Sequence, residues 1–204
     1  MVNGVLTKKN LIEFFSEKVK SSAQEQGADL SEDVEFYLAQ LLTHFSVSKN
    51  LFEENDDGEL EYRPLALRLY DAVFDTRPGL RFIHLKKLGD TSLYHAGVFY
   101  DGLYNQVVDV DYYISMGGNA YHSLANLSTS SEKSLADLFM ELSENFAKLV
   151  EVLRLSCESD VVRNDHDILK LIDRYQKTGS QKARKLLEEE GILTDILTQG
   201  KIEQ

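Results

Sequence analysis

Proline is nearly absent from this chain, and this constrains its fold more than any other feature. The 204 residues contain only two prolines, Pro64 and Pro78. Proline breaks a helix from within but suits its first turn, so the long stretches on either side of these two residues are free to be helical. Apolar residues recur there every three or four positions. The sequence therefore predicts an all-α fold, a single-domain bundle of about seven to eight helices.

Several helix ends are marked by their residue types. Gly27 is placed to end a first helix in the left-handed conformation, and Ser31 to cap the start of the second. Pro64 and Pro78 each suit the first turn of a later helix. Asp57-Gly58 lies between the second helix and Pro64, and it predicts a polar turn.

Two central helices are predicted, one starting at Pro78 and one from residue 107 onward. Gly89 and Gly117 lie inside them. An interior glycine costs a helix roughly 1 kcal/mol relative to alanine. We therefore expect Gly89 to mark a close helix crossing or the approach of a ligand, and Gly117 to mark close packing of helices. The pattern leaves open whether Tyr100-Asp101-Gly102-Leu103, which lies between the two helices, is a loop or a hairpin.

The C-terminal part continues the helical pattern. Apolar residues from Leu135 to Leu153 follow one stripe and predict one long helix. We expect residues 1–160 to form the main bundle and residues 161–193 a helical hairpin packed on it, with Thr178-Gly179 ending its first helix and Ser180 starting its second. Residues 194–204 are expected to be a frayed tail.

Charge and composition exclude several classes of partner. The formal net charge is −12, and the segment from Gln24 to Glu61 holds eleven acidic residues against Lys49 alone. Nucleic-acid binding requires a basic stripe, which this chain lacks. No segment reaches the roughly 18 apolar residues of a membrane span, and the N-terminus lacks a signal-peptide pattern. We therefore expect a cytoplasmic protein. Cys157 is the single cysteine of the chain, so an internal disulfide is impossible.

Tests for known catalytic and metal-binding patterns are negative. The acidic segment that starts at Glu53 partly resembles a calcium-binding loop, but Pro64 stands where that loop needs a glutamate. No histidine follows a glutamate by three positions, as the carboxylate-bridged di-iron bundles require. Phosphate-binding glycine loops and the Gly-x-Ser-x-Gly elbow are absent as well. The sequence thus assigns no catalytic residue, no metal site and no cofactor.

The stretch from His84 to His122 concentrates polar aromatic residues. It holds six of the ten tyrosines, three of the five histidines and five of the twelve glycines. Buried hydroxyl and carboxylate groups need hydrogen-bond partners, so these side chains are expected to form either a pocket or a buried polar network. The candidate residues are Asp90, Tyr94, His95, Tyr112, Tyr113, Tyr121 and His122.

Two interpretations of this group stay open. In the functional one, the residues line a pocket between the two central helices, where Asp90 orients a histidine or tyrosine for acid-base chemistry. In the structural one, they satisfy each other inside the helical core. The structural interpretation is favoured, because a buried aspartate survives only when it is hydrogen-bonded.

Two resemblances can be seen. Leu88-Gly89-Asp90, with Ser92 beyond, is similar to the distal-helix motif of haem oxygenases, which implies haem binding; Leu93 and Tyr94 stand where that family continues with glycines. More of the chain resembles an uncharacterised family of bacterial all-helical proteins. That likeness is carried by Leu88-Gly89-Asp90, Leu93-Tyr94, Gly97-x-Phe99, Asp111-Tyr112-Tyr113, Gly117 and Ala120-Tyr121. It implies a stand-alone bacterial domain without a known activity.

These observations favour a non-enzymatic cytoplasmic module that binds or regulates another protein. The alternative is a helical protein that binds a small ligand or haem, with or without enzymatic activity, in a pocket near Asp90, Tyr94 and His95. A homodimer is a third hypothesis, because the chain has more apolar helix faces than one bundle covers.

Overall fold

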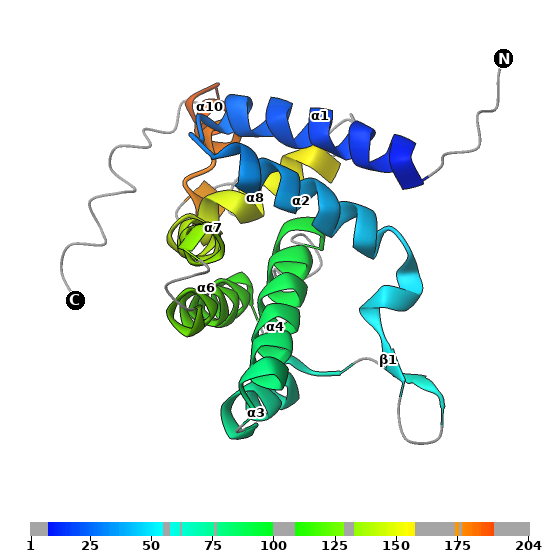
Figure 1. Cartoon of the computed structure of the whole chain (residues 1–204). Coiled ribbons are helices and arrows are strands. Elements are labelled where there is room, and N and C mark those ends of the chain that lie inside the picture. The colour runs from blue at the N-terminus through cyan, green and yellow to red at the C-terminus, as the bar shows by residue number, and fades with distance from the viewer. Residues whose placement is uncertain are drawn as a thin grey trace, which may run out of the picture.

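The computed structural model confirms the all-α class (Figure 1). It describes residues 8–54, 58–61, 63–75, 77–99, 109–128, 133–157, 174–175 and 177–189. Within these ranges there are eight α-helices: α1 (Lys8–Gln26), α2 (Glu32–Phe45), α3 (Leu65–Phe74), α4 (Pro78–Val98), α6 (Val110–Leu127), α7 (Lys133–Glu144), α8 (Phe146–Cys157) and α10 (Gln181–Glu189). None of the described helices is both long and apolar enough to cross a membrane.

The first two helices end and begin where the sequence predicts. Gly27 follows α1 with a φ of +66°, the left-handed conformation that glycine adopts without strain. Ser31 caps α2, since its hydroxyl accepts a hydrogen bond from the backbone nitrogen of Val34 at 3.3 Å. The backbone nitrogen of Ser31 donates in turn to the carboxylate of Glu141 on α7, at 2.8 Å. This cap therefore joins two helices that are 110 positions apart in the chain.

A small β-hairpin was not predicted. After α2, the short 3₁₀ helix η1 (Ser48–Leu51) leads into an antiparallel pair of strands, β1 (Glu53–Glu54) and β2 (Leu60–Glu61). Gly58 has a φ of +79°, as suits the polar turn expected there, while Asp57 lies outside the described residues. Strands of two residues are too short to show the alternation that identifies a strand in a sequence.

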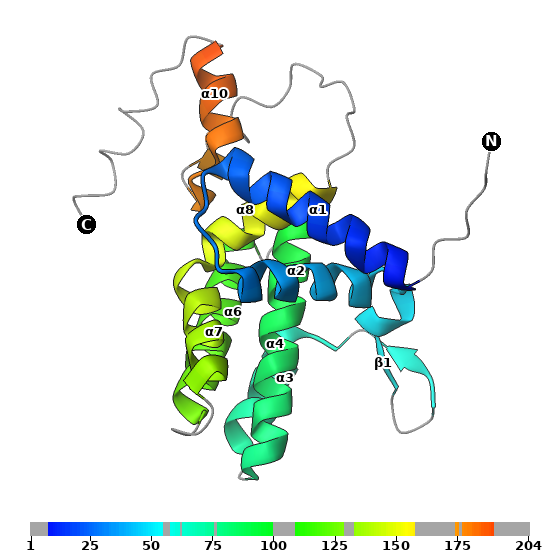
Figure 2. The same cartoon turned by 45° about the horizontal axis from the view of Figure 1, so that its top comes forward.

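The helices α4 and α6 pack against each other in the middle of the molecule (Figures 1 and 2). Pro78 is the first residue of α4, as predicted, and the Asp109 side chain caps α6 by accepting from the nitrogen of Tyr112. In addition, α4 contacts α8 and α3, α6 contacts α7, and α1 packs against α2 and α8. The Tyr100–Leu103 stretch between α4 and α6 lies outside the described residues.

The long helix predicted over Leu135–Leu153 is wrong in one respect, because α7 ends at Glu144 and α8 begins at Phe146. The side-chain amide of the intervening residue, Asn145, donates to the carbonyl oxygen of Glu141 at 3.1 Å. The backbone nitrogen of Asn145 donates to the same carbonyl oxygen at 3.1 Å, so the chain stays hydrogen-bonded across the break. The interruption lets α7 contact α6 while α8 contacts α1 and α4.

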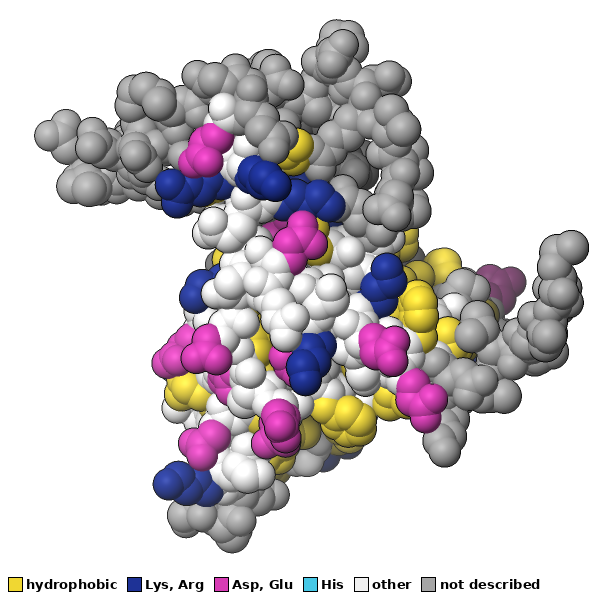
Figure 3. Space-filling view, turned by 90° about the horizontal axis from the view of Figure 1, so that it is seen from above, with side chains coloured by type: hydrophobic (Ala, Val, Ile, Leu, Met, Phe, Trp, Pro, Cys, Tyr) yellow, Lys and Arg dark blue, Asp and Glu magenta, His cyan; other side chains and the backbone are white. Residues whose placement is uncertain are grey.

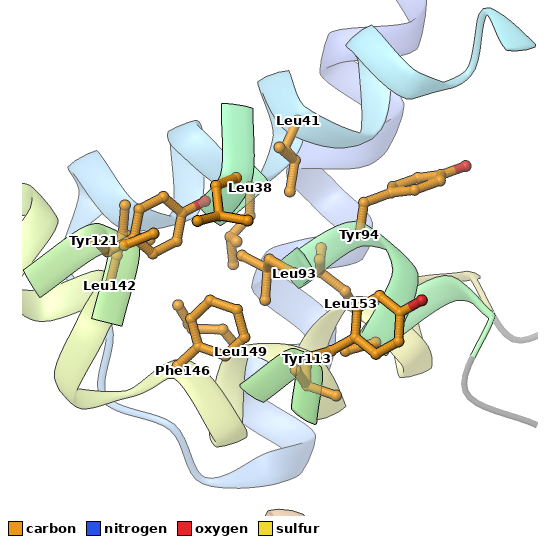
Figure 4. Packing of buried hydrophobic residues seen from close by; sticks show 14 of the residues in the cluster. Leu38, Leu41, Leu93, Tyr94, Tyr113, Tyr121, Leu142, Phe146, Leu149 and Leu153 are labelled. Carbon is orange, nitrogen blue, oxygen red and sulfur yellow. The ribbon is translucent and has the colours of Figure 1, made fainter. Parts of the chain in front are cut away.

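The core is one cluster of buried apolar side chains that draws on α1 to α4 and on α6 to α8. Figure 4 shows its centre, with Leu93 of α4 between the aromatic rings of Tyr121 on one side and those of Tyr94 and Tyr113 on the other. Tyr121 and Leu93 are fully buried. Burial of large side chains contributes about 2 kcal/mol each, so this cluster supplies most of the free energy that holds the helices together.

The C-terminal segment is attached through a buried carboxylate. Glu151 of α8 is fully buried and accepts hydrogen bonds from Arg154, from Arg174 and from the hydroxyl of Ser180, the last at 2.8 Å. Ser180 also caps α10, and Gly179 precedes it with a φ of +65°. The second helix of the predicted hairpin is therefore α10, whereas most of the first, within residues 161–173, lies outside the described residues.

Candidate functional site

Asp90 is the centre of a compact polar cluster between α4, α2 and α6. The hydroxyls of Tyr37 and Tyr121 both donate to its Oδ1 atom, at 2.5 and 2.8 Å. The ammonium of Lys86, one turn earlier on α4, donates to Oδ2 at 2.6 Å. Only 14% of the Asp90 side chain is exposed. We call these four residues the Asp90 cluster.

Gly89 makes the approach of Tyr121 to Asp90 possible. A Cβ atom at position 89 would lie 2.4 Å from Cε1 of Tyr121, far inside van der Waals contact. Gly117 does the same for Phe146, whose ring would lie 2.2 Å from an added Cβ. The absence of these two methyl groups lets α6 come close enough for the Tyr121 hydroxyl to reach the carboxylate.

His95 belongs to a second, aromatic group further along α4. Its ring is stacked on that of Tyr113 with 5.9 Å between centroids, and the rings of Phe99 and Tyr94 lie 5.4 and 6.3 Å away. Burial lowers the pKa of His95 to about 4, and the positive charge of Arg68 adds to this effect. The imidazole is therefore neutral at pH 7.

The structure thus divides the seven residues singled out in the sequence. Asp90 and Tyr121 meet in one cluster, while Tyr94, His95 and Tyr113 form the other. Tyr112 packs edge-on against Tyr113 at 6.0 Å, whereas His122 is exposed on the outer side of α6. The single pocket in which Asp90 orients His95 or Tyr94 is not formed by the described side chains.

Two members of the Asp90 cluster were missed. Tyr37 occurs in the apolar stripe of α2 and has the sequence pattern of an ordinary core residue. Lys86 could have been found from the sequence, because a lysine four positions before an aspartate lies beside it on the same face of a helix. The ring of Tyr37 also lies under the Lys86 ammonium, which is 5.0 Å from the ring centroid.

The Asp90 cluster is better suited to structure than to acid-base chemistry. Burial raises the pKa of both phenols well above the ordinary value, and the charge of Asp90 raises it further. Tyr37 and Tyr121 therefore stay protonated at neutral pH and act as hydrogen-bond donors. Each oxygen of the carboxylate accepts at least one hydrogen bond from the protein's own side chains.

The recess at Asp90 itself is small, whereas the pocket on the far side of Tyr37, between α2 and α7, has a volume of about 230 Å³. A recess between η1, α3 and α4, which Asp90 and Thr91 help to line, has a volume of about 60 Å³. Pockets for drug-sized ligands usually have a volume of 300–1,000 Å³. The recess accommodates a few water molecules but not a haem or a flavin. Among the described residues, no group of three or more His, Cys, Asp or Glu side chains is arranged to hold a metal ion.

A different feature, the outer side of α3, distinguishes the surface. Six of the ten residues of this helix are exposed and none of them is charged: Ala66, Leu67, Leu69, Tyr70, Val73 and Phe74. We call these six residues the α3 face. The opposite side of the helix packs on the molecule through Leu65, Arg68 and Ala72. α3 thus turns its larger apolar side chains outward.

The orientation of α3 follows from Arg68. Its guanidinium is buried and donates to the carboxylate of Glu53 at 2.5 Å and to the carbonyl oxygen of Arg63 at 3.1 Å. A buried guanidinium without such partners would cost several kcal/mol, so this ion pair fixes which side of α3 faces inward. Residues two and five positions further, Tyr70 and Val73, then point away from the molecule.

An open cleft borders the α3 face. It has a volume of about 590 Å³ and is lined by aromatic and charged side chains from α3, α4 and β1, among them Tyr70, Phe74 and His84. Its charges are paired: Arg63 binds Asp71 at 2.5 Å and Arg77 binds Asp75 at 2.9 Å. The bond with Arg77 holds the pKa of Asp75 at about 2.

The face of the molecule opposite α3 carries mixed charges. Figure 3 views the molecule from above, from the side opposite α3 in Figure 1, and there acidic and basic side chains are interspersed over most of the described surface. The α3 face is distinct from that mixed surface because it combines large apolar residues with an absence of charge.

Comparisons with models of protein families, with curated proteins and with solved structures found no match. Only the site geometry therefore supports a function.

Proposed function

We propose that this chain is a non-enzymatic protein-interaction module of the cytoplasm and that it binds through the α3 face. The observation that carries the proposal is the uncharged, apolar outer side of α3, on which Phe74 is 65% exposed. Contiguous apolar patches of several hundred Å² on a soluble protein mark interaction sites. Aromatic residues such as Tyr70 and Phe74 are the types enriched at the centres of interfaces.

The geometry supports this function better than the small-ligand alternative near Asp90, Tyr94 and His95. The recess beside Asp90 is too small for haem or flavin, and the oxygens of Asp90 are already engaged by protein donors. Apolar partners, by contrast, would find the α3 face accessible without any rearrangement of the core.

Affinity capture with three versions of the chain tests the proposal. The versions are the wild type, Phe74→Glu on α3, and Phe36→Glu, a matched change at a phenylalanine on α2 that is 54% exposed. A protein captured by the wild type is identified, purified and titrated against all three. We expect Phe74→Glu to weaken its binding at least tenfold, about 1.4 kcal/mol, and Phe36→Glu to leave it unchanged.

Equal binding by all three versions would contradict the proposal. A thermal-shift screen with haem, flavins and common metabolites is the complementary measurement. A ligand that stabilises the wild type but not Asp90→Asn would instead favour the pocket near Asp90.

A further inference from the structure

We infer that the partner of the α3 face is a second copy of this chain, bound about a two-fold axis that passes close to Tyr70. The inference rests on the proposed function, since it names the occupant of the same surface. Three properties of the described residues carry it: the shape of the α3 face, its area and the charges around it.

The α3 face can match itself. A two-fold interface places the same patch on both copies, so the patch must be complementary to itself. An uncharged stripe along one helix meets this condition when two such helices lie antiparallel. With Tyr70 near the axis, Leu67 of one copy would face Val73 and Phe74 of the other, at equal distances from the centre.

The exposed area is close to what a stable pair needs. The side chains of Leu67, Tyr70, Val73 and Phe74 are each at least half exposed. Together with Leu69, they present roughly 500 Å² of apolar surface. Two copies would then bury about 1,000 Å², at the lower end of specific interfaces. This area predicts a reversible dimer instead of an obligate one.

The distribution of charge favours contact between two copies at the α3 face over contact at the acidic parts of the surface. Copies that each carry a net charge of −12 repel one another, most strongly near the acidic segment from Gln24 to Glu61. Around the α3 face, however, Asp71 and Asp75 are bound by Arg63 and Arg77 of their own chain. Local charge is thus balanced where the apolar surface lies.

Sedimentation velocity of the full chain tests the inference. The wild type, Phe74→Glu and Phe36→Glu are compared from about 1 to about 200 µM, a range that detects association in the micromolar regime. We expect the wild type to shift from 23.2 kDa toward twice that mass as its concentration rises. Phe74→Glu should raise the midpoint of this shift at least tenfold, and Phe36→Glu should leave it in place. Added NaCl should strengthen association, because it screens the repulsion between acidic copies.

A wild type that stays at 23.2 kDa throughout, or a dimer that Phe74→Glu does not weaken, would overturn the inference. The proposed function is judged separately by the capture experiment. If another protein binds through Phe74 while the chain stays monomeric, the inferred homodimer is wrong and the proposed protein-interaction function is supported. If the chain neither dimerises nor binds another protein through Phe74, both the inferred homodimer and the proposed function are wrong.

Cross-linking checks the geometry of the pair. In the Cys157→Ser background, Tyr70→Cys places one thiol near the two-fold axis, and a mild thiol oxidant should link two copies within minutes at micromolar concentration. Phe36→Cys serves as the control and should link far more slowly. Equal rates for the two variants would speak against a dimer centred on α3.

Discussion

At the scale of single residues, Asp90 holds three elements together, and its charge is what its donors recognise. Asp90→Asn keeps the shape but weakens three hydrogen bonds to a charged acceptor. Such bonds contribute about 1.5–3 kcal/mol each in favourable cases, so we expect a loss of roughly 2–4 kcal/mol in the free energy of unfolding. Urea denaturation followed by circular dichroism measures it. Asp137→Asn, at an exposed position of α7, is the matched control and should change stability by less than about 0.5 kcal/mol. Similar losses for both would show that Asp90 is not a structural centre.

His95 makes the stability of the protein depend on pH. Its pKa is lowered to about 4 in the folded state, against about 6.5 unfolded, so the unfolded chain binds the proton more readily. The stabilising effect of the neutral, buried ring is complete above pH 6.5 and is lost as the pH falls from about 6.5 to about 4. Between pH 7 and pH 5 the wild type should lose about 1–2 kcal/mol more than His95→Phe.

Urea titrations of both proteins at the two pH values test this prediction. His122→Gln, at an exposed histidine, should keep the pH dependence of the wild type. If His95→Phe loses as much stability as the wild type on acidification, the histidine is not the responsible group.

The sequence identified part of this chemistry. Asp90 and Tyr121 could be predicted as a buried pair, because a glycine beside an aspartate and a tyrosine-rich helix both indicate close packing with polar contacts. Tyr37 could not, since its contact with Asp90 depends on how α2 crosses α4, and periodicity within one helix carries no information on that. The same limit explains why His95 was grouped with Asp90 although their side chains belong to different clusters.

At the scale of helices, Gly89 and Gly118 should respond oppositely to the same substitution. Both lie inside helices, where alanine is favoured over glycine by about 1 kcal/mol. At Gly89 the new methyl group would meet the ring of Tyr121 at 2.4 Å, whereas at Gly118 it would meet Phe146 at an ordinary 3.8 Å. We expect Gly89→Ala to destabilise by about 1–3 kcal/mol and Gly118→Ala to stabilise by up to about 1 kcal/mol. Thermal unfolding measures both, and a stabilised Gly89→Ala protein would show that the crossing is looser than described.

Helix positions were the most predictable part of the fold. Gly27, Ser31 and Pro78 act through local backbone chemistry, which a sequence displays directly. The interruption at Asn145 was not visible, because the apolar stripe continues across it in register. Only the separate packing partners of α7 and α8 favour a break there. The outward orientation of α3 was hidden for a related reason: its ion pair involves Glu53, a residue on another element.

At the scale of the whole molecule, Glu151 joins the C-terminal segment to the bundle. It is fully buried, and its partners Arg154, Arg174 and Ser180 come from α8 and from the segment before α10. Removing one partner of a buried ion pair typically costs 3–5 kcal/mol, because the remaining charges lose their counter-charge. Glu151→Gln should therefore destabilise the protein by about that amount.

Limited proteolysis shows where this loss acts. In Glu151→Gln, cleavage around residues 174–189 should become at least tenfold faster, while Glu144→Gln, at an exposed position, should leave the rate unchanged. Unaltered cleavage in Glu151→Gln would mean that other contacts hold the segment in place.

The hydrogen bond from the backbone nitrogen of Ser31 to the carboxylate of Glu141 has a consequence for folding during translation. Ser31, at the start of α2, is synthesised 110 residues before Glu141. At about 5–20 residues per second, that delay is roughly 5–20 s. During this interval, water must accept the hydrogen bond of the Ser31 backbone nitrogen. The apolar sides of the nascent helices α1 and α2 stay exposed until the later helices are made. A ribosome-bound chaperone would therefore meet α1 and α2 before the helices that cover them, α7 and α8, have been made.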